Sequence, residues 1–137
     1  MKVKDILDTI ASELAKIDCV FSTRIVTGAL RPIWRGEFPG VLVFAPMFLN
    51  SAGTVVIAVF AKEEEIWETV EAVIDAVDAP MTLPDSADLT LEEVRPFENM
   101  LHRDYGANTS EITGGFAKDA VPVDMVGMCI SYSLAFS

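Results

Sequence analysis

The stretch VDMVGMCISYSLAFS, residues 123–137, alternates with a period of two, as a β-strand with two different faces does. Large side chains share one face: Val126, Met128, Ile130, Tyr132, Leu134 and Phe136. Small or hydroxylated residues share the other: Gly127, Cys129, Ser131, Ser133, Ala135 and Ser137. Burying one large apolar side chain contributes roughly 1.5–3 kcal/mol, comparable to the roughly 1–2 kcal/mol that ordering each residue's backbone costs. We therefore predict that this strand pairs inside a sheet. Its large face would lie under helices, and its small face toward a neighbour, a lumen or solvent.

Two amphipathic helices are predicted to cover that face. The first has apolar residues at helical spacing across residues 3–17, with charges between them. The second begins after Lys62 and ends before Pro80. Its apolar stripe, flanked by Trp67 and Ile74, consists of Ile66, Val70, Val73 and Val77.

Residues 40–61 contain no charge over 22 positions, which is long enough for a membrane helix. Because Pro46, Asn50, Ser51 and Gly53 disfavour a helix there, we predict a hairpin with strands at 40–44 and 54–61. Further strands are predicted at 19–27, 87–93 and from about 123. The element order predicts a single α+β domain over residues 1–137. Its mostly antiparallel sheet of about five strands would carry both helices on one face.

The charge of the chain limits its partners. There are 10 Lys and Arg against 21 Asp and Glu, a net charge of −11, which argues against sequence-specific nucleic-acid binding. An acidic wall could still let DNA pass as non-specific cargo. The apolar fraction of 51% is high for a small soluble protein and predicts self-association. The beginning, MKVKDILDTIASELAKI, indicates no export signal because acids interrupt it.

Motifs for catalysis are not found. His102, the sole histidine, lies in LHRDYG, which shares only three letters with the kinase catalytic loop. Cys19 and Cys129 are too few and too far apart for a disulfide scaffold or metal knuckle, and we expect two buried thiols. No P-loop, dinucleotide fingerprint or nucleophile elbow occurs. We therefore expect neither an enzyme nor a cofactor.

The second predicted helix carries a row of acids at spacings of four, three, four and three: Glu64, Glu68, Glu71, Asp75 and Asp78. The first three could share a calcium ion, since carboxylates from adjacent turns can converge. A solvated face explains them equally well, and acids at 63–65 also suit a helix N-terminus. We expect the solvated face and no metal site.

Two connections are candidate interfaces. The stretch LRPIWRGEF, residues 30–38, contains Arg31, Trp34, Arg35 and Phe38, and Trp and Arg are enriched at interface hot spots. The alternative is that Trp34 caps the edge of the core while the arginines lie in water.

The loop at about 102–121 is longer than compact domains usually contain. Because it includes Tyr105, Ile112 and Phe116, we predict an arm that orders against a partner.

Taken together, the element order, the FPGVLVF strand after an arginine-rich connection, the acidic second helix and the long late loop resemble one family. The chain resembles the tail terminator, or tail completion, proteins of long-tailed bacteriophages, over nearly its full length but only as a pattern. The resemblance implies a structural virion protein made in the host cytoplasm. It would form a ring, expected to be hexameric, that caps the tail tube, ends tail polymerisation and joins the tail to the head.

The implied partners are further copies of the chain, the tail tube protein and the head-tail connector protein, with DNA only as cargo and no membrane. Ring closure requires two different sticky patches on each copy, for which the two connections are candidates. The acidic helix face would line the channel. The alternatives are another neck or tail ring component, such as a head-tail adaptor or tube protein, and a cytoplasmic domain that binds a small ligand on the small-residue face of the last strand.

Overall fold

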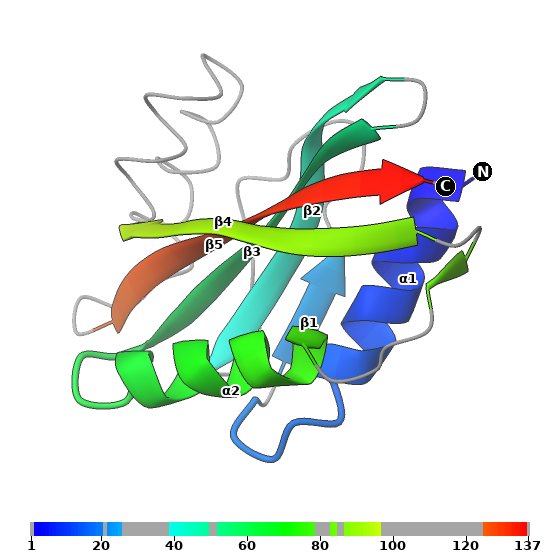
Figure 1. Ribbon diagram of the computed structural model, residues 1–137. Helices are drawn as coiled ribbons and strands as arrows, with labels where there is room; N and C mark the ends of the chain where they lie inside the picture. The colour runs from blue at the N-terminus through cyan, green and yellow to red at the C-terminus, as the bar shows by residue number, and fades with distance from the viewer. Residues whose placement is uncertain are drawn as a thin grey trace.

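The computed structural model describes residues 2–20, 22–25, 39–49, 52–78, 83–84, 87–96 and 125–136. Within these ranges, two helices and five strands follow one another: α1 (Lys2–Leu14), β1 (Ser22–Ile25), β2 (Gly40–Leu49), β3 (Ala52–Lys62), α2 (Ile66–Asp78), β4 (Ala87–Pro96) and β5 (Met125–Phe136). The strands form one sheet in the order β1-β2-β3-β5-β4 (Figure 1). The predicted α+β class is confirmed.

Four of the strands make an antiparallel sheet, and the short β1 joins it in parallel beside β2. The C-terminal strand β5 lies between β3 and β4, with Ile57 opposite Ile130 and Val55 opposite Tyr132. A strand with neighbours on both sides satisfies its backbone groups fully. The C-terminal strand therefore lies inside the sheet, as predicted.

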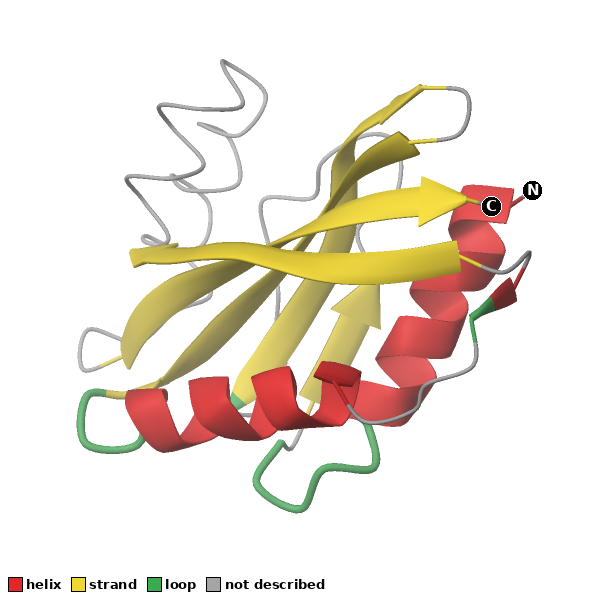
Figure 2. Cartoon of the chain, in the orientation of Figure 1, coloured by secondary structure: helices red, strands yellow, loops and turns green. Residues whose placement is uncertain are grey.

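The uncharged stretch forms the β2–β3 hairpin, as predicted (Figure 2). Its strands are longer than expected, because β2 runs through Pro46 to Leu49 and only residues 50 and 51 separate the two. The pairing register shifts between Phe44 and Met47. A proline has no N–H for the ladder and is tolerated at such an irregularity, so Pro46 interrupts the pairing without ending the strand. In the described part of the chain, no helix has the length and apolarity needed to cross a membrane.

Both helices bury their apolar stripes against the same face of the sheet. α1 packs on β1 and β2, and α2 packs on β3 and β5. One cluster joins the helix residues to alternate strand residues, among them Val43, Ile57 and Ile130. Tyr132 and Leu134 belong to the same cluster, which confirms the predicted position of the large face of β5 over these residues. α1 ends at Leu14, earlier than the periodicity indicated, because the next residues form tighter turns such as Ile17 N–H to Leu14 O at 3.2 Å.

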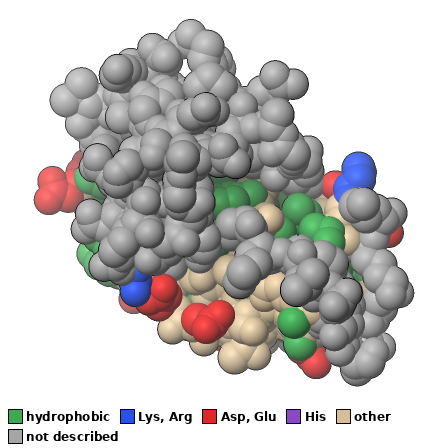
Figure 3. Space-filling model, turned by 90° about the horizontal axis from the view of Figure 1, so that it is seen from above, with side chains coloured by type: hydrophobic (Ala, Val, Ile, Leu, Met, Phe, Trp, Pro, Cys, Tyr) green, Lys and Arg blue, Asp and Glu red, His purple; other side chains and the backbone are tan. Residues whose placement is uncertain are grey.

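The central part of the opposite face of the sheet is also buried, which corrects one expectation. Cys129 and Ser131, on the small face of β5, are only 0% and 4% exposed, so the chain itself covers this part of the face. Their neighbours on that face are buried as well: Leu42, Phe44, Val56, Ala58 and Phe60. Seen from the side away from α2, hydrophobic side chains show near the centre and charged ones at the rim (Figure 3). Strands buried on both faces have continuous apolar sequences, as β2 and β3 do.

Candidate functional site

The five predicted acids of the second helix are all exposed. Glu64 lies in the turn that precedes α2, and the other four lie on the helix itself. Hydrogen bonds link this turn to the strand before it and to the helix after it. Glu65 N–H donates to Lys62 O at 2.9 Å, and Thr69 N–H donates to Glu65 O at 3.0 Å. The hydroxyl of Thr69, which is buried, also donates to Glu65 O at 2.9 Å. The first turn of the helix is thereby fixed relative to the end of β3.

Helical spacing divides these acids into two rows. Glu68 and Asp75 lie opposite the buried stripe, and together with Glu64 in the preceding turn we call them the outer row. Glu71 and Asp78 lie on one side of the helix, which is also the side of Trp67 and Ile74.

The ion pairs found among the described residues are Lys4–Asp8, Lys16–Glu13 and Arg95–Glu93, and α2 takes part in none of them. Residues 63–78 contain seven acids and no lysine or arginine. The exposed side of α2 therefore carries a local excess of negative charge.

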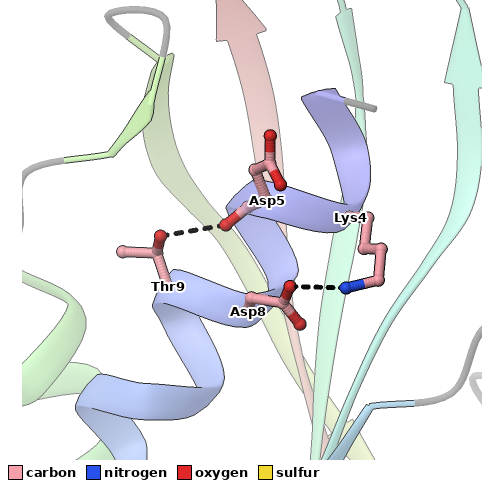
Figure 4. A network of polar contacts seen from close by, with 4 residues as sticks. All are labelled: Lys4, Asp5, Asp8 and Thr9. Atoms are coloured by element: carbon pink, nitrogen blue, oxygen red, sulfur yellow. Dashed lines mark hydrogen bonds and ion pairs between the residues drawn. The ribbon is translucent and has the colours of Figure 1, made fainter.

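The exposed side of α1 is balanced by comparison. Lys4 Nζ donates to the carboxylate of Asp8 at 2.8 Å, and the Thr9 hydroxyl donates to the backbone carbonyl of Asp5 at 2.9 Å (Figure 4). The hydrogen bond and the charge of Asp8 raise the pKa of Lys4. Because α1 carries such pairs and α2 does not, the negative potential of the described surface is concentrated on α2.

The carboxylates of α2 do not gather into a metal site. Within the described ranges, no three His, Cys, Asp or Glu side chains lie together as potential ligands of an ion. Nothing therefore brings Glu64, Glu68 and Glu71 together as the calcium alternative would require.

An exposed tryptophan was not singled out from the sequence. Trp67 is 60% exposed on α2, and the other exposed large apolar side chains among the described residues are Leu91 at 41% and Val126 at 36%. The sequence placed Trp67 beside the buried stripe, which is correct. The stripe alone does not reveal its exposure, because this depends on how far the sheet extends beneath that side of the helix.

The remaining interface candidates lie outside the described residues. They are Arg31, Trp34, Arg35 and Phe38 in the first connection, and Tyr105, Ile112 and Phe116 in the loop at about 102–121. His102 lies outside as well. Their roles stay predictions.

Two buried residues of β5, Cys129 and Tyr132, carry titratable side chains. Cys129 is a free thiol, and its burial raises its pKa, so that it stays protonated and is a poor nucleophile at neutral pH. Tyr132 is 0% exposed, and its hydroxyl has no hydrogen-bond partner among the residues that the structure describes. Burial, and secondly the charge of Asp78, raise the pKa of Tyr132. Both groups thus stay neutral and belong to the packed interior.

No protein-family model matches the chain, and a search of curated proteins finds no significant match.

Proposed function

We propose that this chain is a structural subunit of a bacteriophage tail, a tail terminator that closes into a ring at the end of the tail tube. In this role it ends tail polymerisation and joins the tail to the head connector, while DNA passes through its channel. The pattern resemblance of the sequence is the starting point. The α+β class of the fold agrees with the subunit that this resemblance implies.

The observation that carries the proposal is the outer row of α2. Glu64, Glu68 and Asp75 are exposed and form no ion pair with a described residue. A channel for DNA needs a wall that does not bind phosphate, and carboxylates without neighbouring cations meet that need. The outer row would face the channel.

The high apolar fraction of the sequence does not by itself explain self-association in this fold. The sheet buries apolar residues on both faces, which accounts for much of the high apolar fraction. The two connections, at residues 30–38 and about 102–121, are therefore the surfaces from which a ring would be built. A heterologous contact needs two such patches on each copy.

Electron microscopy and light scattering of the purified chain test the assembly. We expect single rings of uniform size. Long cylinders would indicate a tube protein instead. A monomer at high concentration would overturn the proposal, and a monomer that binds a small molecule saturably would favour the ligand-binding alternative.

Ring orientation provides a second test. A reconstruction that places Glu68 and Asp75 on the outer rim would contradict the channel assignment. The matched solution experiment is the double change Glu68→Lys and Asp75→Lys, which we expect to preserve rings but make them retain duplex DNA at low salt. The control is Asp5→Lys with Asp18→Lys, which changes the net charge equally on exposed residues that do not belong to α2.

A further inference from the structure

The helix layer of this fold is narrower than its sheet. Strands are spaced about 4.8 Å apart and packed helices about 8–10 Å, so two helices cover about four strands. α1 packs on β1 and β2, and α2 on β3 and β5, which leaves the edge strand β4 (Figure 1). On the helix side of β4, Leu89, Leu91 and Val94 are opposite the core residues Leu134, Tyr132 and Ile130. Leu91 is nevertheless 41% exposed, because no described helix covers it.

One side of α2 borders this uncovered strand. β3 and β4 are parallel to each other, since each is antiparallel to β5, and α2 connects them. The connection has the usual right-handed sense (Figure 1). At about 100° per residue in a right-handed helix, this sense directs Trp67 and Ile74 toward β4 and the small residues Ala72 and Ala76 toward α1.

Six apolar residues lie along this border, and we call them the β4 strip: Trp67, Ile74, Leu89, Leu91, Val94 and Val126. Val126 belongs to it because it is opposite Ala61, a residue of the helix-side core. All six are exposed or only partly buried. The strip is therefore an apolar surface beside α2, at the place where a third helix would continue the layer.

Charge indicates which kind of helix fits. Glu71 and Asp78 lie on the strip side of α2, within a segment that has no basic residue. Arg95 is on the opposite face of the sheet, opposite Cys129, and pairs with Glu93 at 2.9 Å. A second copy of a chain with net charge −11 would bring further acid to this acidic border. A cationic partner would gain from complementarity instead.

We propose that the β4 strip binds a basic amphipathic helix of another protein, which lies beside α2 as the third helix of the layer. Its apolar stripe packs on Leu91 and Trp67, and its lysine or arginine side chains pair with Glu71 and Asp78. This is helix-in-groove recognition, in which apolar anchors give affinity and the flanking charges give orientation. The inference does not depend on the ring or on a phage origin.

The test uses synthetic peptides as probes. One contains leucine and lysine at amphipathic helical spacing, a second replaces each lysine with glutamate, and a third has the composition of the first in scrambled order. Trp67 reports binding by its fluorescence in a Trp34→Phe variant, because the chain has only two tryptophans. Anisotropy of labelled peptide on the unmodified chain provides the same information if that variant folds poorly. We expect saturable binding of the first peptide alone.

Variants locate the site. The double change Glu71→Lys and Asp78→Lys is expected to weaken peptide binding about tenfold or more. Trp67→Ala should weaken it by a similar factor, as the loss of a hot-spot residue does, and its binding is measured by the anisotropy of the labelled peptide. The control Asp5→Lys with Asp18→Lys has the same net charge and should bind unchanged. Equal loss in both charge variants would mean attraction by net charge alone and would overturn the proposal. So would binding of the scrambled peptide, or self-association through Trp67 in the absence of peptide.

Discussion

Replacing Tyr132 with phenylalanine should stabilise the protein. The ring of Tyr132 is 0% exposed in the core between the sheet and the helices, and its hydroxyl has no hydrogen-bond partner among the described residues. A buried polar group without a partner costs about 1–3 kcal/mol, whereas an ordinary buried hydrogen bond contributes about 1 kcal/mol. Tyr132→Phe retains the ring and removes the desolvated hydroxyl. We expect the free energy of unfolding to rise by about 1 kcal/mol, which is opposite in sign to the loss expected for a hydrogen-bonded tyrosine.

The same substitution should change the alkaline stability. The ordinary pKa of tyrosine is 10.0, and burial raises the pKa of Tyr132 above it in the folded state. Above about pH 10 the unfolded chain therefore loses this proton while the folded chain keeps it. The free energy of unfolding then falls by about 1.4 kcal/mol per pH unit for one such group. Cys129 acts in the same direction from its ordinary value of 9.0, so Tyr132→Phe should reduce the alkaline slope without abolishing it.

Urea unfolding of both proteins at about pH 7 and at several values above pH 9 measures the two effects. Tyr105→Phe is the matched control, because Tyr105 is the only other tyrosine of the sequence. The reasoning is refuted if Tyr132→Phe loses about 1 kcal/mol at neutral pH and keeps the full alkaline slope, since the hydroxyl would then have a partner in the folded state.

Three further predictions concern stability and reactivity. Ile57→Ala removes a fully buried side chain from the centre of β3 and should cost about 2–5 kcal/mol in urea unfolding, with the helical circular dichroism retained in the absence of urea. Thr69→Val removes the hydrogen bond to Glu65 O at nearly constant shape and should cost about 1 kcal/mol, and an unchanged midpoint would show that this bond is unimportant. In a thiol titration with Ellman's reagent, the half-buried Cys19 should react first and the buried Cys129 only on unfolding. Fast reaction of both thiols in the folded protein would contradict the burial of β5.

The period-two pattern of β5 was sufficient to predict that Ile130, Tyr132 and Leu134 lie under the helices. It could not predict the burial of Ser131, because small and hydroxylated residues are compatible with solvent as well as with a packed interior. What decides between these environments is whether another part of the protein covers that face of the sheet, and the alternation of one strand does not contain this information. The same limit applies to Pro46, which indicates an interruption of pairing but not whether the strand continues beyond it.

The acidic face of α2 could be predicted from spacing, since a buried stripe at Ile66, Val70 and Val73 directs the intervening acids outward. The β4 strip could not. Its residues come from a helix and two strands that are separated in sequence, and it exists because α2 ends the helix layer before the sheet ends. The periodicity of one segment does not predict how wide the helix layer is relative to the sheet.

Burial on both faces of the sheet changes what the composition of this chain means for assembly. The continuous apolar run at residues 55–61 is buried within the fold. A mean hydropathy of +0.37 therefore does not by itself require that the chain bind a partner. The described surface carries an uneven negative charge: α1 has ion pairs, whereas the acids of α2 have none with a described residue. Copies of such a chain repel one another unless their contacts keep the outer rows of α2 apart or turn them toward water, and a ring with a solvent-filled channel does the latter. The same charge attracts cations, so the side of α2 that carries Glu71 and Asp78, next to the β4 strip, is where a basic helix would be most stable.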